Sequence, residues 1–252
     1  MSVTSGAEIY RRPEVVAYYD REQDLQGAER LLFDRYVKPG AEILDLGVGA
    51  GRTTPHLARL ASRYVGVDVS KEMIARCREK FPDLTFLQLD ATDLSTMADA
   101  SFDVVVFSFN GIDVIPTVAG RRRCLAECAR VLRPRGHLLF SVHNPRYLVF
   151  TPQLEGVGPM RALWRSAYAG VHTAACVATR LPSAAFWKGS GYVLDPMGPA
   201  IAKIYVAAPE RVSRELAAAG LAIEERVAGQ FPRGGGRFRT PWYYYACVKR
   251  SA

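Results

Sequence analysis

Short apolar runs alternate with amphipathic stretches between residues 41 and 144. Five runs rich in Val, Leu, Ile and Phe have the length of β-strands; they are residues 41–48, 63–70, 84–91, 102–109 and 136–144. The stretches between them show helical spacing, with Ser70 as the expected N-cap of one helix and Pro134 and Gly136 as the expected end of another. Apolar strands that alternate with helices are typical of a parallel sheet covered on both faces. The pattern predicts an α/β fold with a doubly wound sheet.

The regular alternation stops at residue 145. Residues 145–200 contain many prolines and large aromatic side chains without a clear period; the rings are Phe150, Trp164, Tyr168, Phe186, Trp187 and Tyr192. We interpret this segment as an insertion after the fifth strand, on the side of the sheet where α/β proteins bind ligands. Its rings can line an apolar pocket, form a subunit interface or pack the insertion's own core. Strand and helix patterns then return, ending in "LAIEERVA" and "WYYYACVK".

Composition narrows the class of protein further. The 252 residues carry a formal net charge of +8, no apolar run approaches the length of a membrane span, and the N-terminus lacks the apolar core of a signal peptide. The five cysteines are scattered, which is typical of free thiols in a reducing compartment. These features predict a cytoplasmic globular protein with no metal site and no membrane partner. Arginines cluster at 120–124 and 233–239, which indicates either attraction for phosphate or ordinary solvated surface charge.

The candidate chemistry begins in "ILDLGVGAGRTT", residues 43–54. Its glycines do not match the dinucleotide pattern G-x-G-x-x-G, because the third glycine comes one residue early. Asp45 precedes them, and a carboxylate there would oppose a pyrophosphate at the helix N-terminus. It would suit a ligand with an ammonium and a sulfonium group instead. Asp68 ends the second strand, where an acid can accept both ribose hydroxyls, and Asp90 ends the third. The loop therefore favours a cationic nucleoside.

Four segments in this order carry a family resemblance. "LDLGVGAGR", "VGVDVS", "LQLDAT" and "VLRPRGHLLFSV" together resemble the class I S-adenosylmethionine-dependent methyltransferases, over about residues 10–144 and more weakly over 205–252. The resemblance implies a Rossmann-like sheet of seven strands and S-adenosyl-L-methionine as the cofactor. It also implies three parts of the chain: a cofactor-binding core with an N-terminal lid helix (1–144), a substrate-side insertion (145–200) and a return to the core (201–252).

The resemblance also implies how the methionine and ribose parts of the cofactor are held. Asp45 would orient the amino group, and the loop from Gly47 through Val48 to Gly49 would lie beside the methionyl and ribosyl parts. Asp68 would accept the ribose hydroxyls. Ser108 and Asn110 follow the fourth strand, where the backbone of the family contacts the methionine end.

The adenine is implied to lie further along the same edge. Val69 and Met73 match apolar positions that flank the ring. Asp90 and Ala91 match the pair that recognises its edge, a carboxylate accepting from the amino group and a backbone N–H donating to the ring. Tyr19, in the leading segment "VVAYYDRE", matches a lid that folds over the cofactor.

Groups that could accept a proton from the methyl acceptor should follow strands four and five. The catalytic candidates are therefore Asn110, Asp113 and His143, and His143 is the best base on its ordinary pKa. The place after strand four reads "SFNGID", without the Asn/Asp-Pro-Pro-Tyr/Phe motif of enzymes that methylate adenine in nucleic acids. None of the cysteines has the proline or threonine neighbour typical of a nucleophile for pyrimidine methylation.

The leading hypothesis is a methyltransferase that transfers a methyl group to a small organic acceptor, on oxygen or nitrogen. A methyltransferase acting on RNA or protein is the alternative, supported by the arginine clusters, although nucleic acid is the less favoured partner. A non-catalytic cofactor-binding subunit is a third hypothesis. A homodimer formed through the insertion is a further expectation, and it follows from the aromatic side chains of that segment.

Overall fold

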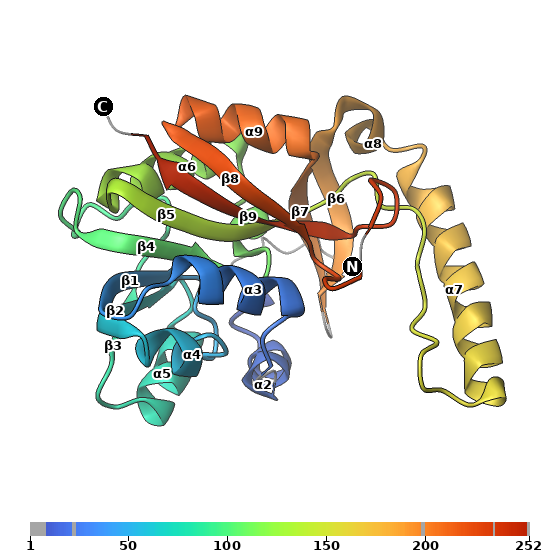
Figure 1. The fold of residues 1–252 in the computed structure, drawn as a ribbon, viewed down its shortest axis with the longest axis horizontal. Helices are drawn as coiled ribbons and strands as arrows, with labels where there is room; N and C mark the ends of the chain where they lie inside the picture. The colour runs from blue at the N-terminus through green and yellow to red at the C-terminus, as the bar shows by residue number, and fades with distance from the viewer. Residues whose placement is uncertain (1–8, 22–23, 198–199, 234, 251–252) are drawn as a thin grey trace.

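A single seven-stranded sheet organises the chain. The computed structural model describes residues 9–21, 24–197, 200–233 and 235–250, and its main sheet has the order β3-β2-β1-β4-β5-β9-β8 (Figure 1). The strands are β1 Ala41–Leu46, β2 Ala61–Asp68, β3 Thr85–Gln88, β4 Phe102–Phe107, β5 Leu132–His143, β8 Leu221–Ala228 and β9 Trp242–Lys249. β1 to β5 pair in parallel, whereas β9 runs antiparallel to both β5 and β8. The predicted doubly wound α/β fold is confirmed.

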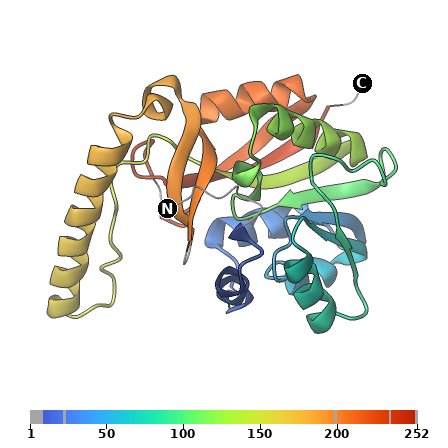
Figure 2. The same ribbon diagram turned by 180° about the vertical axis from the view of Figure 1, so that it is seen from behind.

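Helices cover both faces of this sheet. α3 (Gly27–Tyr36), α4 (Thr54–Ala58) and α5 (Lys71–Lys80) pack on one face, whereas α6 (Val118–Val131) and α9 (Pro209–Ala218) pack on the other (Figures 1 and 2). Each face has its own buried apolar cluster, because strands that alternate side chains on two covered faces must be apolar throughout. The carboxyl ends of β1, β2, β4 and β5 consequently meet at one edge of the sheet.

Two predictions concern helix ends, the beginning of α5 and the end of α6. Ser70 does cap α5, since its hydroxyl accepts from the N–H of Met73 at 3.3 Å. The predicted end of α6 at Pro134 and Gly136 is wrong, because α6 ends at Val131 and both residues belong to β5. β5 starts early because Leu132 already pairs with Phe102 of β4, before a register shift. Proline is tolerated there, at the beginning of a strand.

The segment after β5 contains its own elements. α7 (Pro159–Arg180) and α8 (Ala184–Lys188) lead into β6 (Ser190–Met197) and β7 (Ala200–Ala207), which form a separate antiparallel sheet. Figures 1 and 2 show α7 standing away from the main sheet, at the end of the molecule beyond this hairpin. The sequence segment "AKIYVAA" thus belongs to β7 and pairs with β6 rather than with the main sheet. None of the helices in the described ranges is both long enough and apolar enough to cross a membrane.

The N-terminal helix lies at the same end of the sheet as the strand termini. α2 (Pro13–Arg21) packs beside α5, with Val16 in a small apolar cluster with Ala50 and Met73. Tyr10 and Tyr19 pack against that cluster, and their ring centroids lie 5.6 Å apart. α2 therefore covers the glycine loop and the start of α5 from outside.

Candidate active site

The loop after β1 has a backbone that only glycine adopts without strain. Gly47 and Gly49 have φ angles of +60° and +56°. A Cβ at Gly47 would lie 2.6 Å from Cε2 of Phe107, whereas a Cβ at Gly49 would meet nothing within 4 Å. Gly47 is therefore a packing requirement, and Gly49 presents bare backbone to open space. A ligand can approach the chain closely at Gly49.

Asp45 is a buried carboxylate at the base of this loop. Its side chain is 1% exposed, and its Oδ2 accepts from the Thr53 hydroxyl at 2.6 Å and the Tyr64 hydroxyl at 2.8 Å. Burial raises the pKa of Asp45 to about 6, because desolvation outweighs the two hydrogen bonds that favour the charged form. Both hydroxyls use Oδ2, so Oδ1 keeps its capacity to accept a hydrogen bond from a ligand.

Asp68 is fixed by backbone groups at the end of β2. The N–H of Gly49 donates to its Oδ2 at 2.9 Å, and the N–H of Ser70 donates to its Oδ1 at 2.8 Å. Desolvation raises the pKa of Asp68, although these backbone bonds oppose the shift. A carboxylate has about four acceptor positions. The two that remain can accept the two hydroxyls of one ribose.

These residues line one cavity at the carboxyl edge of the sheet. Of the residues predicted to bind the cofactor, the following line it: Tyr19, Asp45, Gly47, Val48, Gly49, Asp68, Val69, Met73, Asp90, Ala91 and Ser108. The cavity combines buried carboxylates with bare glycine backbone and an apolar region at Val69, Met73 and Leu89. That set fits S-adenosylmethionine, which presents an ammonium group, a ribose and an adenine ring. Direct contact of each side chain with the cofactor stays a prediction.

Asn110 is the predicted cofactor residue that does not line the cavity, although its chain neighbours Phe109 and Gly111 do. Its backbone has a left-handed conformation with φ of +62°, and its N–H donates to the hydroxyl of Ser141 at 2.7 Å. Its side-chain Nδ2 lies 3.3 Å from Nε2 of His143. Asn110 therefore connects the cavity wall to the end of β5.

Several lining residues were not predicted from the sequence. Tyr10, Arg52, Thr53 and Phe109 also line the cavity. Arg52 directly follows the third glycine of the loop, and this position is the sequence feature that could have identified it as a lining residue. Its guanidinium is held by Glu29 through two bonds of 2.6 and 2.7 Å.

Glu29 of α3 is fully buried under the loop. It accepts from Arg52, from the backbone N–H of Gln26 and from the hydroxyl of Ser108. Its partners follow three different elements, so sequence spacing gave no sign of the contact. Through Ser108 and Arg52, Glu29 connects the end of β4 to the glycine loop.

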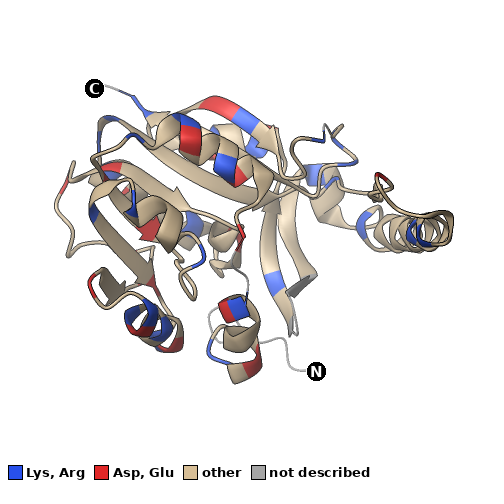
Figure 3. Cartoon of the chain, turned by 60° about the horizontal axis from the view of Figure 1, so that its bottom comes forward, with Lys and Arg blue, Asp and Glu red and all other residues tan. Residues whose placement is uncertain are grey.

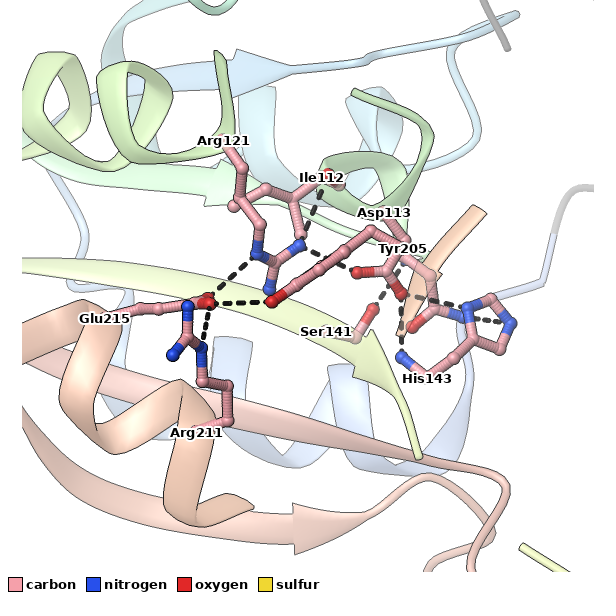
Figure 4. A network of polar contacts seen from close by, with 9 residues as sticks. Ile112, Asp113, Arg121, Ser141, His143, Tyr205, Arg211 and Glu215 are labelled. Carbon is pink, nitrogen blue, oxygen red and sulfur yellow. Dashed lines mark hydrogen bonds and ion pairs between the residues drawn. The ribbon is translucent and has the colours of Figure 1, made fainter. Parts of the chain in front are cut away.

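The three catalytic candidates come together at the ends of β4 and β5. Asp113 lies in the short helix η1 (Gly111–Val114), and its Oδ2 is 2.9 Å from Nδ1 of His143 and 2.7 Å from the backbone N of His143 (Figure 4). An ionised Asp113 can only accept, so Nδ1 carries the proton that points at Oδ2. In the neutral imidazole, Nε2 is then the basic nitrogen, and it is the atom that faces Asn110.

A buried arginine holds Asp113 in turn. Nη1 of Arg121 donates to Oδ1 of Asp113 at 2.9 Å, and Nε donates to Glu215 at 3.0 Å (Figure 4). The hydroxyl of Tyr205 and Nε of Arg211 also donate to Glu215, at 3.2 and 2.9 Å. The interpretation of the first arginine cluster as solvated surface charge is therefore wrong for Arg121, which is 1% exposed.

The aromatic rings of the insertion lie elsewhere. None of the six rings lines the cofactor cavity among the described residues. Phe186 is buried, Tyr192 packs against Tyr205, and Phe150 packs against Tyr168 and His172. Trp164 and Trp187 are 72% and 70% exposed. The rings thus pack within the insertion, pack against the core as Tyr192 and Phe186 do, or face outward.

Comparison with known proteins gives the same class as the fold and the cavity. The family described as a methyltransferase domain matches residues 44–140. An uncharacterised methyltransferase of Synechocystis is 32% identical over 152 residues, which are 58% of this chain and 70% of that protein. A demethylmenaquinone methyltransferase of Beutenbergia cavernae is 42% identical over 104 residues, and the match spans 41% of each protein.

Solved structures share the fold. The 1,6-didemethyltoxoflavin-N1-methyltransferase of Burkholderia thailandensis, with its acceptor and S-adenosylhomocysteine bound, superposes with a TM-score of 0.58 at 16% identity. The superposition covers 93% of this chain and 81% of that one. The protein thus belongs to the class I S-adenosylmethionine-dependent methyltransferases. The cofactor of this family is S-adenosyl-L-methionine, as the resemblance of the four sequence segments implied.

Proposed function

We propose that the chain transfers a methyl group from S-adenosylmethionine to oxygen or nitrogen of a small organic acceptor, with His143 as the general base. The observation that carries this proposal is the contact of 2.9 Å between Nδ1 of His143 and Oδ2 of Asp113. This contact favours the proton on Nδ1 and leaves Nε2 as the base, at the end of β5. His143 and Asp113 do not themselves line the cofactor cavity, whose wall reaches Phe109 and Gly111. When bound, S-adenosylmethionine supplies an electrophilic methyl group on a sulfonium.

The chain's own residues would supply orientation and proton transfer. The acceptor atom forms the new bond to the methyl carbon as the carbon–sulfur bond breaks, and its proton passes to Nε2 of His143. Asp113 stabilises the resulting imidazolium, because its carboxylate already faces Nδ1. Asn110 lies 3.3 Å from Nε2 and would have to yield this contact to the acceptor. Phe109 and Tyr19, 6.5 Å apart at their ring centroids, would help to exclude water from the cavity.

Two of the compared proteins support a small acceptor. The Beutenbergia protein is named for demethylmenaquinone, and the Burkholderia enzyme holds 1,6-didemethyltoxoflavin. Both acceptors are organic molecules rather than polymers. The place after β4, "SFNGID", lacks the motif of adenine methylation in nucleic acids.

The experiment is methyl transfer from labelled S-adenosylmethionine to a fractionated cell extract. Parallel samples are treated with nuclease or with protease before the reaction. We expect label in the low-mass fraction in all samples. Label that disappears after nuclease or after protease treatment would refute the small acceptor.

The role of His143 is tested with the acceptor found in this way. His143→Ala should keep the affinity for the cofactor within a few-fold and lower turnover by about 10²–10⁴-fold. If the acceptor is a phenol, the loss should shrink at high pH, because the acceptor then ionises without a base. His137→Ala is the matched control, since His137 lies on the same strand and pairs with Glu224. Near-normal turnover of His143→Ala at neutral pH would exclude the base.

A methyltransferase acting on RNA is the second candidate. Arg146, Arg226 and Arg237 line a separate hollow beside the start of α9, together with Glu210. Arg146 is neutralised by Glu210 at 3.0 Å. We expect only weak binding of transfer RNA, lost at physiological salt, because each phosphate contact steepens the salt dependence. Salt-resistant, sub-micromolar binding would favour this candidate.

A further inference from the structure

Helix α7 is a long helix that the body of the protein hardly covers. Of its 22 residues, Pro159–Arg180, two are buried, Ala169 and Cys176. Helices of globular proteins usually bury a whole stripe against the core. The exposed side chains of α7 are nevertheless large and apolar: Met160 is 67% exposed, Trp164 72% and Val171 71%.

The exposed apolar side chains form one continuous strip. The α7 strip is defined here as Met160, Leu163, Trp164, Tyr168 and Val171, which are all more than half exposed. Their spacing of three and four residues places them on one face of a helix with 3.6 residues per turn. At about 100° per residue, Ala169 and Cys176 fall on the opposite face. The helix therefore packs on the protein with small side chains and presents its large ones outward.

The charges around this strip have one sign. Arg161 and Arg165 lie on α7, and Lys188 lies on α8, whereas no Asp or Glu occurs between Glu155 and Asp195. Figure 3 shows basic but no acidic colour on α7. Arg161 follows Met160 by one residue, so its guanidinium flanks the strip, whereas the guanidinium of Arg165 donates to the backbone carbonyl of Gln153 at 2.7 Å. An apolar face flanked by cations, with Trp and Tyr among its members, is the composition of helices that lie in a membrane interface.

The position of α7 allows contact with a flat surface. Figures 1 and 2 show α7 at one extreme of the molecule, and no other described element lies beyond it. A planar partner can therefore touch the full length of the helix without meeting the main sheet.

We infer that the α7 strip docks on an anionic lipid surface, with the strip entering the interface and Arg161 facing lipid phosphates. This peripheral contact differs from a membrane span, for which none of the described helices is long and apolar enough, and it is an alternative to the expectation of no membrane partner. It goes beyond the proposed methyl transfer, because it does not depend on which acceptor the cavity takes.

A second copy of the chain fits the strip less well. Two strips in contact would bring the arginines of both helices together, with no acidic residue in the segment to oppose them. Like charges brought together in this way destabilise an interface. Anionic lipid supplies the missing charge.

The experiment is flotation of the full-length chain with vesicles of phosphatidylcholine, with or without phosphatidylglycerol. We expect binding to the anionic vesicles and release by high salt. The double variant L163S/W164S should bind at least about ten-fold more weakly, because apolar burial is lost. Arg161→Glu should bind at least about five-fold more weakly, because it removes a cation near the surface and adds an anion.

Two control variants match these changes elsewhere on the surface. Leu87→Ser replaces an exposed leucine on β3, and Arg122→Glu makes the same charge change on α6. Both should bind as the wild type does. Tryptophan fluorescence should shift to shorter wavelength with anionic vesicles, and Trp164→Phe but not Trp187→Phe should abolish the shift.

Two lipid-binding results and one sedimentation result would contradict the docking of the α7 strip on lipid. Absence of binding to anionic vesicles, or equal binding by L163S/W164S with unchanged circular dichroism, would overturn the inference. Sedimentation without lipid is expected to show a monomer. A dimer that L163S/W164S converts to a monomer would assign the strip to a second copy instead. Cofactor affinity, measured in the same variants, distinguishes a lost surface from a lost fold.

Discussion

Replacement of Asp45 by asparagine should move stability and cofactor affinity in opposite directions. The carboxylate is almost fully buried in the cofactor-free chain, and burial raises its pKa from 3.8 to about 6. The charge is needed only when a cation occupies the cavity. The buried carboxylate of Asp45 therefore destabilises the cofactor-free chain, although the same charge favours the bound cofactor.

The direction in which the free energy of unfolding changes with pH follows from proton binding. Between pH 3.8 and about 6, the folded chain holds a proton on Asp45 that the unfolded chain has released. The free energy of unfolding therefore falls as pH rises through this window, and the full cost is present above it. The difference between the two pKa values corresponds to about 3 kcal/mol.

Asparagine keeps the shape and removes the charge. Its carbonyl oxygen can still accept from the hydroxyls of Thr53 and Tyr64, whereas its new N–H groups need partners in the cavity. We expect Asp45→Asn to raise the free energy of unfolding at pH 7.5 by about 1–3 kcal/mol, and the melting temperature by about 2–4 °C for each kcal/mol. The gain should disappear near pH 4, where the wild-type carboxyl is protonated in the folded chain.

Cofactor affinity should fall in the same variant. Loss of a charged hydrogen bond to the amino group costs about 1.5–3 kcal/mol, which is about ten- to hundred-fold in the dissociation constant. In the wild type, affinity should also weaken as pH falls below about 6, because binding then has to expel the proton from Asp45. Calorimetry of S-adenosylmethionine binding at several pH values measures both effects.

Asp103→Asn is the matched control. Desolvation raises the pKa of Asp103, but the backbone N–H of Glu42 and the guanidinium of Arg133 lower it further, so the net direction is downward. A lowered pKa stabilises the folded chain above the ordinary pKa, and that stability is lost as pH falls. Asp103→Asn should therefore destabilise the chain at pH 7.5 and leave cofactor affinity unchanged. An Asp45→Asn variant that is less stable than the wild type at pH 7.5 would refute the account of the buried charge.

Three further experiments test other parts of the site. Asp68→Ala should weaken cofactor binding by at least about ten-fold more than Asp90→Ala, because charge-assisted bonds to ribose have no substitute; equal small losses in calorimetry would mean that the ribose lies elsewhere. Gly47→Ala should lower the free energy of unfolding by about 2 kcal/mol or more, since its Cβ would meet Phe107 in addition to the strain of the positive φ. Gly49→Ala should cost only that strain, about 1–2 kcal/mol, and should reduce cofactor affinity; urea titration and calorimetry separate the two. Arg121→Met should cost about 3–5 kcal/mol of stability, because it leaves the buried carboxylate of Asp113 without its guanidinium partner; a change under about 1 kcal/mol in urea would contradict the burial.

The parts of the site that the sequence predicted depend on short-range patterns. Asp45 and Asp68 each end an apolar run, and parallel strands place such ends at one edge of the sheet. Ser70 was predicted as an N-cap from its position before a helical pattern. The geometry of a parallel sheet therefore brings these residues to the glycine loop. Their positions can be predicted without knowledge of any long-range contact.

Long-range partners could not be predicted in the same way. Glu29 and Arg52 are separated by 23 residues, and Arg121 and Glu215 by 94, so no periodicity connects them. Arginine within a run of arginines is usually solvated, and only the packed structure shows that Arg121 is not. Helix α7 was missed for a related physical reason. Its large apolar residues recur at helical spacing, but the opposite face carries small apolar residues such as Ala169 and Cys176, so the segment lacks the polar face that marks an amphipathic helix.

The buried network around Arg121 has a consequence for catalysis rather than for stability. A buried ion pair adds little net stability, because desolvation of both charges offsets their attraction. What the guanidinium does in this site is to hold the carboxylate of Asp113 in place, with one oxygen on Arg121 and the other on His143. Through Glu215 and Tyr205 the same guanidinium connects α6 to α9 and β7, the elements that follow the insertion. Packing of the insertion's hairpin and orientation of the base are therefore physically coupled, and a change in either should alter turnover before it alters cofactor affinity.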